Sequence, residues 1–367
     1  MDMMYVEECC EILDSMRVPI TAANREEGDY PYYGANGIQD HVAHYIFDDE
    51  LVLLAEDGGN FGSKERPIAY RVSGKCWVNN HAHVLKPKAW IDVDYLCYSL
   101  MFYKVDGMVN GATRQKLTQA AMRKMQIPSR SMEQQLHIVD ELNRIVKIKE
   151  QRQIELQLLD DLIKARFVEL FGDVQQEEKY KGIPLRELCT TMSGGTPSTK
   201  FPEYYEGNIP WISTISLGPN HIDGSTAKRY ITQDAIDNSA TKLIPAGNIL
   251  FGTRVGVGKS SLNDIDICIN QDIVAIIGID ESRFKRLFIK HVLDAYQPYY
   301  DSIKKGATIL GITVDDLKNT YIPNAPIEIQ MEYESFVNQV DKSKVVVQKA
   351  LKEAQLLFDS LMQQYFG

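Results

Sequence analysis

The chain carries one long segment twice, and this duplication constrains its fold more than any other feature of the sequence. The stretch GATRQKLTQAAMRKMQIP, which begins at Gly111, aligns without a gap with GATILGITVDDLKNTYIP, which begins at Gly306. The offset of 195 residues holds as far as the Phe-Gly pairs that end at Gly172 and Gly367. Because the segment occurs twice and has a long period, it indicates a duplicated domain and not a solenoid of short repeats.

Each copy of the repeat continues into a long segment with helical periodicity. After the Ile-Pro pairs that end at Pro128 and Pro323, apolar residues recur with the 3-4-3-4 spacing of a coiled-coil seam over about 40 residues, or ~60 Å of helix. Ser131 and Gln134 have the spacing of a capping box at the start of the first helix. We therefore predict two long helices that pair along this seam; two unrelated amphipathic surface helices are the alternative.

A lysine interrupts the seam at the same place in both predicted helices. Seven of ten seam positions are apolar in the first copy and nine of ten are apolar or aromatic in the second. The exception that both copies share is Lys149 in one and Lys344 in the other. Because a single polar residue in a coiled-coil seam can fix its register, we predict that these lysines set the register of the helix pair.

The segments before each copy of the repeat differ from it in kind. Residues 1–110 and 174–305 hold short strand-like runs such as ELVLLAEDGG and DICINQDIVAIIG between glycine and proline turns. Such runs predict compact domains that are mostly β or α+β. The chain therefore divides into a first domain (1–110), a first repeat with its helix (111–173), a second domain (174–305) and a second repeat with its helix (306–367).

The stretch FGTRVGVGKSS, from Phe251 to Ser261, comes close to a phosphate-binding loop. That motif needs a glycine, four residues and then Gly-Lys-Ser/Thr, and a helix must follow at once so that its first amides hold the phosphates. Here Thr253 occupies the position of the first glycine, and strand-like residues follow the loop. The pattern favours a glycine-rich turn between strands, and an NTPase or nuclease that uses this loop is the alternative.

Charge and cysteine content narrow the class of protein. The net charge is −10, and residues 1–110 carry 9 Lys and Arg against 18 Asp and Glu, so bulk attraction to nucleic acid is not expected. No apolar run reaches the ~18 residues of a membrane helix, and the acidic start MDMMYVEECCEILD lacks the basic region of a signal peptide. The six cysteines have no metal-ligand spacing. We expect a reduced, cytoplasmic protein without a structural zinc, a cofactor or a membrane partner.

Several stretches follow one another along the chain in a distinctive order: YPYYGANGI, LVLLAEDGGNFG, WVNNHAHVL, MQIPSRSMEQQLHIVDELN, FVELFGD, SGGTPSTKFPEYYEGNIPWIS, NILFGTRVGVGKS and CINQDIVAI. Taken in this order, they resemble the specificity (S) subunit of type I restriction–modification systems, the HsdS family. The resemblance covers essentially the whole chain and depends on the ordered set together with the duplication. The segment SGGTPSTK opens the second domain and has no counterpart in the first, so the two halves should recognise different sequences.

The resemblance implies an α+β architecture in which two globular target-recognition domains are separated by two long antiparallel coiled-coil helices with pseudo-twofold symmetry. Each domain would read one half of a bipartite site in double-stranded DNA. The helices would set the spacing of the half-sites and dock two methyltransferase (M) subunits, and restriction (R) subunits would join the full complex. Such a subunit is not an enzyme, and the sequence lacks a methyltransferase, S-adenosylmethionine or Walker A motif. A coiled-coil scaffold that does not bind DNA is a further alternative.

Candidate DNA contacts lie in the polar and glycine-rich turns of both domains. Arg254 suits guanine or a phosphate, Lys259 suits a phosphate, and the amides of Asn270 and Gln271 suit adenine. The carboxylates of Glu56 and Asp57, which occupy the place that corresponds to the glycine-rich turn, could accept from cytosine N4. The predicted DNA-binding set is Tyr32, Tyr33, Asn36, Gly37, Glu56, Asp57, Gly58, Asn60, Asn79, Asn80, His81, Gly195, Thr196, Ser198, Ser213, Thr214, Lys228, Arg229, Arg254, Gly256, Lys259, Asn270 and Gln271.

A metal site is an alternative for part of the first domain. Asp57, His81 and His83 are potential ligands, but their spacing matches no common metal motif. We therefore predict no metal.

Overall fold

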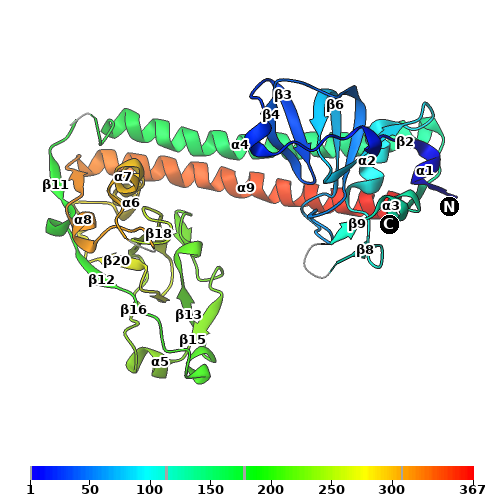
Figure 1. Ribbon diagram of the computed structural model, residues 1–367. Coiled ribbons are helices and arrows are strands. Elements are labelled where there is room, and N and C mark those ends of the chain that lie inside the picture. The colour runs from blue at the N-terminus through cyan, green and yellow to red at the C-terminus, as the bar shows by residue number, and fades with distance from the viewer. Residues whose placement is uncertain (1, 112–114, 177–178, 307–308) are drawn as a thin grey trace. The chain divides into compact units, whose positions relative to one another are not determined.

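Figure 1 shows a computed structural model of the chain, which describes residues 2–111, 115–176, 179–306 and 309–367. The chain divides into two compact units: unit 1 is formed by Met1–Ile154 and Val347–Gly367, and unit 2 by Glu155–Val346. Each unit contains one β domain and a part of each long helix, so the chain passes from one unit to the other within these helices.

The β domain of unit 1 is built on one six-stranded sheet with the order β2-β7-β5-β6-β3-β4. Neighbouring strands are antiparallel except for β3 and β6, which are parallel. The central β5 is buried on both faces, because Val52 and Leu54 join one apolar cluster and Leu51 and Leu53 join another. The strands are β2 (Cys10–Ile12), β3 (Tyr30–Gly34), β4 (Gly37–Val42), β5 (Phe47–Ala55), β6 (Ala69–Val78) and β7 (Ala82–Pro87).

Short elements complete unit 1. The helix α2 (Val93–Met101) packs on the sheet and contributes Tyr95, Leu96 and Leu100 to the first of these clusters. The remaining elements are β1 (Met3–Tyr5), which pairs with β10 (Gln126–Pro128), β8 (Val109–Asn110), which pairs with β9 (Lys116–Leu117), and the helices α1 (Val6–Cys9) and α3 (Gln119–Arg123).

The β domain of unit 2 divides its strands between two sheets. A five-stranded sheet has the order β12-β20-β17-β18-β14, and a four-stranded sheet has the order β15-β13-β19-β16. The strand β17 corresponds to β5, and it is also buried on both faces. The strands are β12 (Thr190–Ser193), β13 (Ile209–Ile212), β14 (His221–Ile222), β15 (Arg229–Ile231), β16 (Leu243–Ile244), β17 (Ile249–Gly252), β18 (Ser260–Asn263), β19 (Ile267–Ile269) and β20 (Ile273–Ile277).

The repeat is visible in the small elements of unit 2 as well. Strand β11 (Gly182–Pro184) pairs with β21 (Tyr321–Pro323) in the same way as β1 pairs with β10 in unit 1. The duplication therefore includes the segment that precedes each β domain, which the 195-residue offset does not reveal. The helices of unit 2 are α5 (Gln233–Asp237), α6 (Arg286–Ala295), α7 (Gln297–Ile303) and α8 (Val314–Lys318).

The two long helices are α4 (Met132–Phe171) and α9 (Ile327–Phe366), each of 40 residues, which confirms the predicted length. The predicted capping box is also present, because Ser131 N donates to Gln134 Oε1 (3.1 Å) and Gln134 N donates to Ser131 Oγ (3.3 Å). None of the described helices combines the length and the apolar character that crossing a membrane requires.

The long helices pair in an antiparallel manner within each unit. In unit 1, the Lys149 ammonium of α4 lies 4.9 Å from the centre of the Phe358 ring of α9, and Tyr365 donates to Glu141, about two turns nearer the start of α4. In unit 2, the rings of Phe167 and Tyr333 pack at 5.6 Å between centroids. Residue numbers rise on α4 as they fall on α9, which is the predicted orientation.

The two seam lysines have different partners. Lys344 Nζ lies 2.6 Å from Asp160 Oδ1, whereas Lys149 lies over the ring of Phe358. The reason is visible in the repeat, because Gln355 stands in the second copy where the first has Asp160. A role of both lysines in setting the register stays a prediction.

A buried glutamine ties the start of each long helix to the β domain of its unit. Gln135 in α4 accepts from Asp92 N (2.8 Å) and donates to Trp90 O (3.1 Å) and Arg130 O (3.0 Å). Gln330 in α9 repeats these contacts with Lys285 N (2.8 Å), Arg283 O (3.1 Å) and Ala325 O (2.8 Å). Both side chains are 0% exposed, and all their partners are backbone groups. They fix where α2 and α6 begin relative to the long helices.

Candidate nucleic-acid interface

The glycine-rich stretch of unit 2 is the tip of a β-hairpin. Residues 253–259 join β17 to β18, and Gly252 N donates to Lys259 O (2.9 Å) at the base of the tip. Gly256 and Gly258 have φ values of +70° and +84°, a left-handed conformation that favours glycine. A strand follows the tip and not a helix, so the amides of a helix N-terminus are not available for a nucleotide. The prediction of a turn is confirmed, and Arg254, Gly256 and Lys259 are exposed on it.

A second turn, between β19 and β20, lies against this hairpin tip. Thr253 N donates to Asp272 O (2.8 Å), and the Arg254 guanidinium lies 3.8 Å from the Asp272 carboxylate. Asn270 is buried and holds the turn, since its side chain accepts from Asp272 N (3.2 Å) and donates to Asp272 Oδ2 (3.1 Å). Gln271 is exposed and accepts a hydrogen bond from the Thr196 hydroxyl.

Unit 1 contains the same arrangement with different side chains. Glu56 N donates to His81 O (2.9 Å), as Thr253 N donates to Asp272 O in unit 2. The buried Asn79 accepts from His81 N (2.8 Å), and His81 Nδ1 lies 2.7 Å from Asp57 Oδ1. By these contacts Asn79 corresponds to Asn270, His81 to Asp272 and Asp57 to Arg254.

The repeat segment holds the first turn in place in both units. Leu117 N donates to Glu56 O (2.7 Å) in unit 1, and Ile312 N donates to Thr253 O (2.8 Å) in unit 2. Leu117 and Ile312 are themselves related by the 195-residue offset. Glu56 and Thr253 are therefore structurally equivalent, which is the correspondence expected from the sequence.

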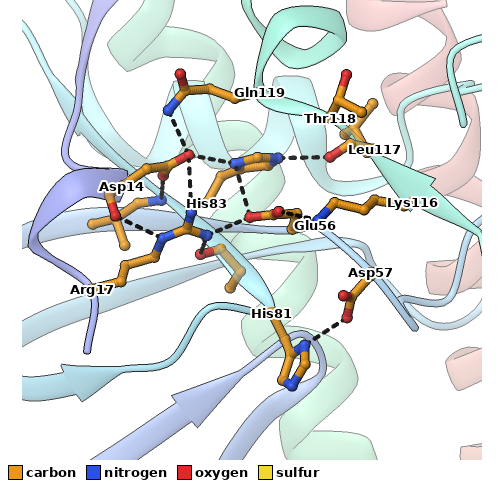
Figure 2. A network of polar contacts seen from close by, with 12 residues as sticks. Asp14, Arg17, Glu56, Asp57, His81, His83, Lys116, Leu117, Thr118 and Gln119 are labelled. Carbon is orange, nitrogen blue, oxygen red and sulfur yellow. Dashed lines mark hydrogen bonds and ion pairs between the residues drawn. The ribbon is translucent and has the colours of Figure 1, made fainter. Parts of the chain in front are cut away.

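The side chain of Glu56 points into a buried ionic network and not towards the surface. Its carboxylate lies 2.5 Å from Arg17 Nη1 and 2.9 Å from Lys116 Nζ. Next to it, the fully buried His83 lies 2.7 Å from Asp14 Oδ2 through Nδ1 and 2.9 Å from the carbonyl of Leu117 through Nε2. Figure 2 shows these side chains converging, whereas Asp57 and His81 pair outside the network. The Glu56 carboxylate is therefore occupied by ion pairs within the protein, and its role as a DNA contact stays a prediction.

The network shifts the pKa values of its two carboxyl groups. Burial acts to raise the pKa of Glu56, but hydrogen bonds from Lys116 and Arg17 outweigh it and hold the pKa below its usual value. Burial opposes ionisation of Asp14 as well, and hydrogen bonds from His83, Val84 N and Gln119 lower its pKa in the same way. Both groups are therefore carboxylates at neutral pH.

The network also bears on the possible metal site. Its ligand-type atoms, from Asp14, Glu56 and His83, lie within 4.8 Å of one another, but Arg17 and Lys116 already neutralise the carboxylates. The three ligands considered from the sequence, Asp57, His81 and His83, do not form one cluster. His83 pairs with Asp14, whereas His81 pairs with Asp57. The residues present favour an ionic link between the β domain and the segment around Lys116.

We expect this network to make unit 1 sensitive to acid. A carboxyl group with a lowered folded-state pKa contributes stability above its unfolded pKa of about 4, and this contribution is lost as pH falls through the folded pKa. Asp14→Asn should therefore lower the free energy of unfolding of unit 1 by about 2 kcal/mol at pH 7, because His83 and Val84 N lose an ionised acceptor. Hydrogen exchange of peptides that span β7, followed from pH 7 to pH 3, measures this.

The control for this experiment is Asp29→Asn, a change of the same type at an exposed position of unit 1. The control variant should match the wild type across the pH range. Equal protection of β7 in Asp14→Asn and in the wild type at pH 7 would contradict the role that we assign to the network.

The other predicted residues of unit 1 fall into two groups. Tyr33, Asn36, Gly37 and Asn60 line one hollow of the surface, and Asn36 is held there by Gly58 O (3.0 Å) and Asn60 Nδ2 (3.1 Å). Tyr32 is buried, with Arg25 4.2 Å from its ring centre and its hydroxyl near the backbone of Ile20. The side chains of Tyr32 and Asn79 are therefore enclosed by protein, whereas Asn80 and Gly58 are exposed.

In unit 2 the predicted residues are likewise divided between exposed and buried positions. Thr196 and Ser198 are exposed, Ser213 is half-buried, and Gly195 and Thr214 are buried. Lys228 and Arg229 are exposed at the start of β15, on the four-stranded sheet, whereas the hairpin tip belongs to the five-stranded sheet. Gly195, Thr214 and Asn270 are covered by protein, and their role as DNA contacts stays a prediction.

Sequence reasoning missed three features of this region. Asp272 was not predicted, although it stands two residues after Asn270 as His81 stands two residues after Asn79. The partners of Glu56 were also missed, because Arg17 lies 39 residues away in the chain. Gln135 and Gln330 were missed even though they are identical at the offset of 195.

Comparison with known proteins identifies the family. The family model for the type I restriction modification DNA specificity domain matches residues 1–158 and 177–355. The chain belongs to this family. Type I restriction enzyme specificity subunit S.HindORF215P of Haemophilus influenzae is 26% identical, over 98% of this chain and 92% of the relative. The EcoR124I/EcoR124II specificity subunit of Escherichia coli is 27% identical, over 81% of this chain and 71% of the relative.

Solved structures of type I restriction–modification proteins share the fold of this family member. The S subunit of the type I restriction–modification system from M. genitalium superimposes with a TM-score of 0.58, at 12% identity, over 100% of this chain and 96% of the other. A structure that describes complex assembly and conformational transition of the type I system gives a TM-score of 0.58, at 16% identity, over 100% and 97%. The architecture of two α+β domains with two long helices, expected from the resemblance, is confirmed.

Proposed function

We propose that the β domains, residues 1–110 and 174–305, are target-recognition domains that each read one half of a bipartite site in double-stranded DNA. The observation that carries this proposal is the pair of equivalent turns in the two units, built on the same backbone contacts but bearing different side chains. Two domains that recognise different DNA sequences need the same backbone arrangement with different side chains on it. The chain contributes recognition to its complex, and chemistry on the DNA belongs to its partners.

The unit 2 turns offer the groups that DNA recognition needs. Arg254 and Lys259 are exposed cations on a tip whose glycines allow close approach, and Gln271 is an exposed amide. Base edges in the major groove are read by such guanidinium and amide groups, while lysines suit phosphates. We assign Lys259 to a phosphate, and in unit 1 we assign base contacts to the region of His81 and of the hollow lined by Asn36 and Asn60.

The long helices are proposed to hold two methyltransferase subunits and to set the spacing of the half-sites, and restriction subunits are proposed to join this complex. Exposed apolar side chains on both helices support the docking role. Leu158 and Leu162 lie one turn apart on α4 and are 62% and 46% exposed, and Val345 and Val346 on α9 are 64% and 68% exposed. Apolar side chains that cluster in water favour coverage by a partner.

The proposed function predicts a single bipartite pattern of modified bases. The chain, co-expressed with its methyltransferase subunit in a host that lacks other adenine methylation, should produce modified adenines at one two-part sequence. Sequencing of modified bases across the host genome measures this. Modification without sequence preference, or at an uninterrupted site, would argue against two separate readers.

The charge of the chain predicts weak DNA binding by the isolated subunit. With a net charge of −10 it neutralises few phosphates, so its affinity for the specific duplex at physiological salt should be about tenfold or more below that of the complex with methyltransferase subunits. A mobility-shift titration with and without the methyltransferase compares the two, with a scrambled duplex as control. Tight, specific binding by the subunit alone would contradict this dependence.

A further inference from the structure

The two units carry the same kind of pair, a carboxylate beside a nitrogen-bearing side chain, at the same place, but with the two partners exchanged between the turns. In unit 2, Arg254 stands on the first turn and Asp272 on the second, 3.8 Å apart. In unit 1, Asp57 stands on the first turn and His81 on the second, 2.7 Å apart. The backbone contacts described above make Asp57 equivalent to Arg254 and His81 equivalent to Asp272. The pair is therefore retained while its order is reversed.

Exposure assigns the same roles to the partners in both pairs. The carboxylate is the covered partner, with 14% of the Asp272 side chain and 16% of the Asp57 side chain exposed. The nitrogen-bearing group is the accessible partner, at 56% for Arg254 and 33% for His81. Each unit thus presents a nitrogen group to solvent beside a less exposed carboxylate, and Figure 2 shows the pair of unit 1.

We propose that these pairs are specificity determinants of the two half-sites and that Arg254, oriented by Asp272, reads a guanine. This inference rests on the proposed function and deepens it. The guanidinium can donate two parallel hydrogen bonds to O6 and N7 of guanine. Asp272 limits the orientations of the long Arg254 side chain before DNA arrives, which lowers the entropic cost of binding.

The Asp272 carboxylate also favours a base over a phosphate as the partner of Arg254. A negative charge beside the guanidinium repels a phosphate, whereas the edge of guanine is neutral. Lys259, on the same tip, has no ion pair with a carboxylate among the residues that the structure describes. The two exposed cations of the tip therefore divide their roles, with Arg254 on a base and Lys259 on the backbone.

In unit 1 an imidazole takes the accessible place that the guanidinium has in unit 2. His81 comes from the other turn and is shorter, so it cannot make the same two-pronged contact with guanine. Asp57 accepts from Nδ1 and so orients the imidazole ring. The two units should therefore require different bases at corresponding steps of their half-sites.

The test uses the chain assembled with its methyltransferase subunits and a set of duplexes in which each base pair of the recognised site is varied in turn. Arg254→Ala should reduce the preference for guanine at one position of one half-site by about tenfold or more and leave the other half-site unchanged. Arg254→Lys keeps the charge but not the two-pronged geometry, so it should lose the same preference while retaining overall affinity better. Asp272→Asn should cause a smaller loss at the same position.

Lys259→Ala is the matched control on the same tip. It should weaken binding equally on all duplexes and reduce the salt dependence of the affinity without changing any base preference. Because Arg254 is exposed, its variants should melt at the wild-type temperature, which a thermal scan verifies. A specific wild-type complex whose Arg254→Ala or Arg254→Lys variant keeps the full guanine preference would overturn this inference alone. A wild-type complex without any base preference would instead overturn the proposed function.

Discussion

A complex in which α4 and α9 each carry four additional residues should modify a site with a longer spacer and lose activity on the original site. The insertions belong between Ile154 and Glu155 and between Val346 and Val347, where the chain passes from one unit to the other. Four residues add ~6 Å of helix, close to two base-pair steps, and turn it by ~40°, close to the twist of one base pair. The spacer should therefore grow by about one or two base pairs if the helices set the spacing of the half-sites.

The loss of methylation activity of the insertion variant on the original site should be large. One unit alone keeps only half of the base contacts, so methylation of the original duplex should fall by about 100-fold or more. Rates on a series of duplexes with spacers of different length measure both effects. The control carries the same four residues after Asn238, in an exposed turn of unit 2, and should keep the original spacer. An unchanged spacer in the helix variant would show that the helices do not determine it.

The features that could be predicted from the sequence depend on residues close together in the chain. The length of α4 and α9 follows from seam periodicity, the start of α4 from Ser131 and Gln134, and the glycine-rich turn from the strand-like residues that follow it. The antiparallel pairing of the two long helices and the presence of two α+β domains were expected from the resemblance to a family. Local rules were sufficient for these elements because each depends on contacts within one helix turn or one hairpin.

The candidate site was predicted less completely, because its contacts join distant parts of the chain. Glu56 and Asp57 are neighbours in the sequence, but successive side chains of an extended segment point to opposite sides. Glu56 is therefore covered and pairs with Arg17 and Lys116, whereas Asp57 meets His81. Sequence position alone could not separate these roles, since it does not show which face of the sheet is covered.

The buried glutamines that join each long helix to its β domain, Gln135 and Gln330, give the second large expected effect, a loss of stability. Gln135→Leu and Gln330→Leu should each lower the free energy of unfolding of one unit by about 3 kcal/mol, because two buried carbonyl groups and one buried N–H lose their partner. Leucine has a similar volume, so the loss reports hydrogen bonding and not a cavity. Gln151→Leu, at an exposed position of α4, is the matched control and should leave stability close to that of the wild type.

The two variants should act on different units, so each variant serves as a control for the other. Gln135 contacts the backbone before α2 in unit 1, and Gln330 contacts the backbone before α6 in unit 2. Hydrogen exchange should therefore rise in α2 peptides for Gln135→Leu and in α6 peptides for Gln330→Leu. In the assembled complex, each variant should weaken recognition of only the half-site read by its own unit. Loss of both half-sites with either variant would mean that the units do not read DNA independently.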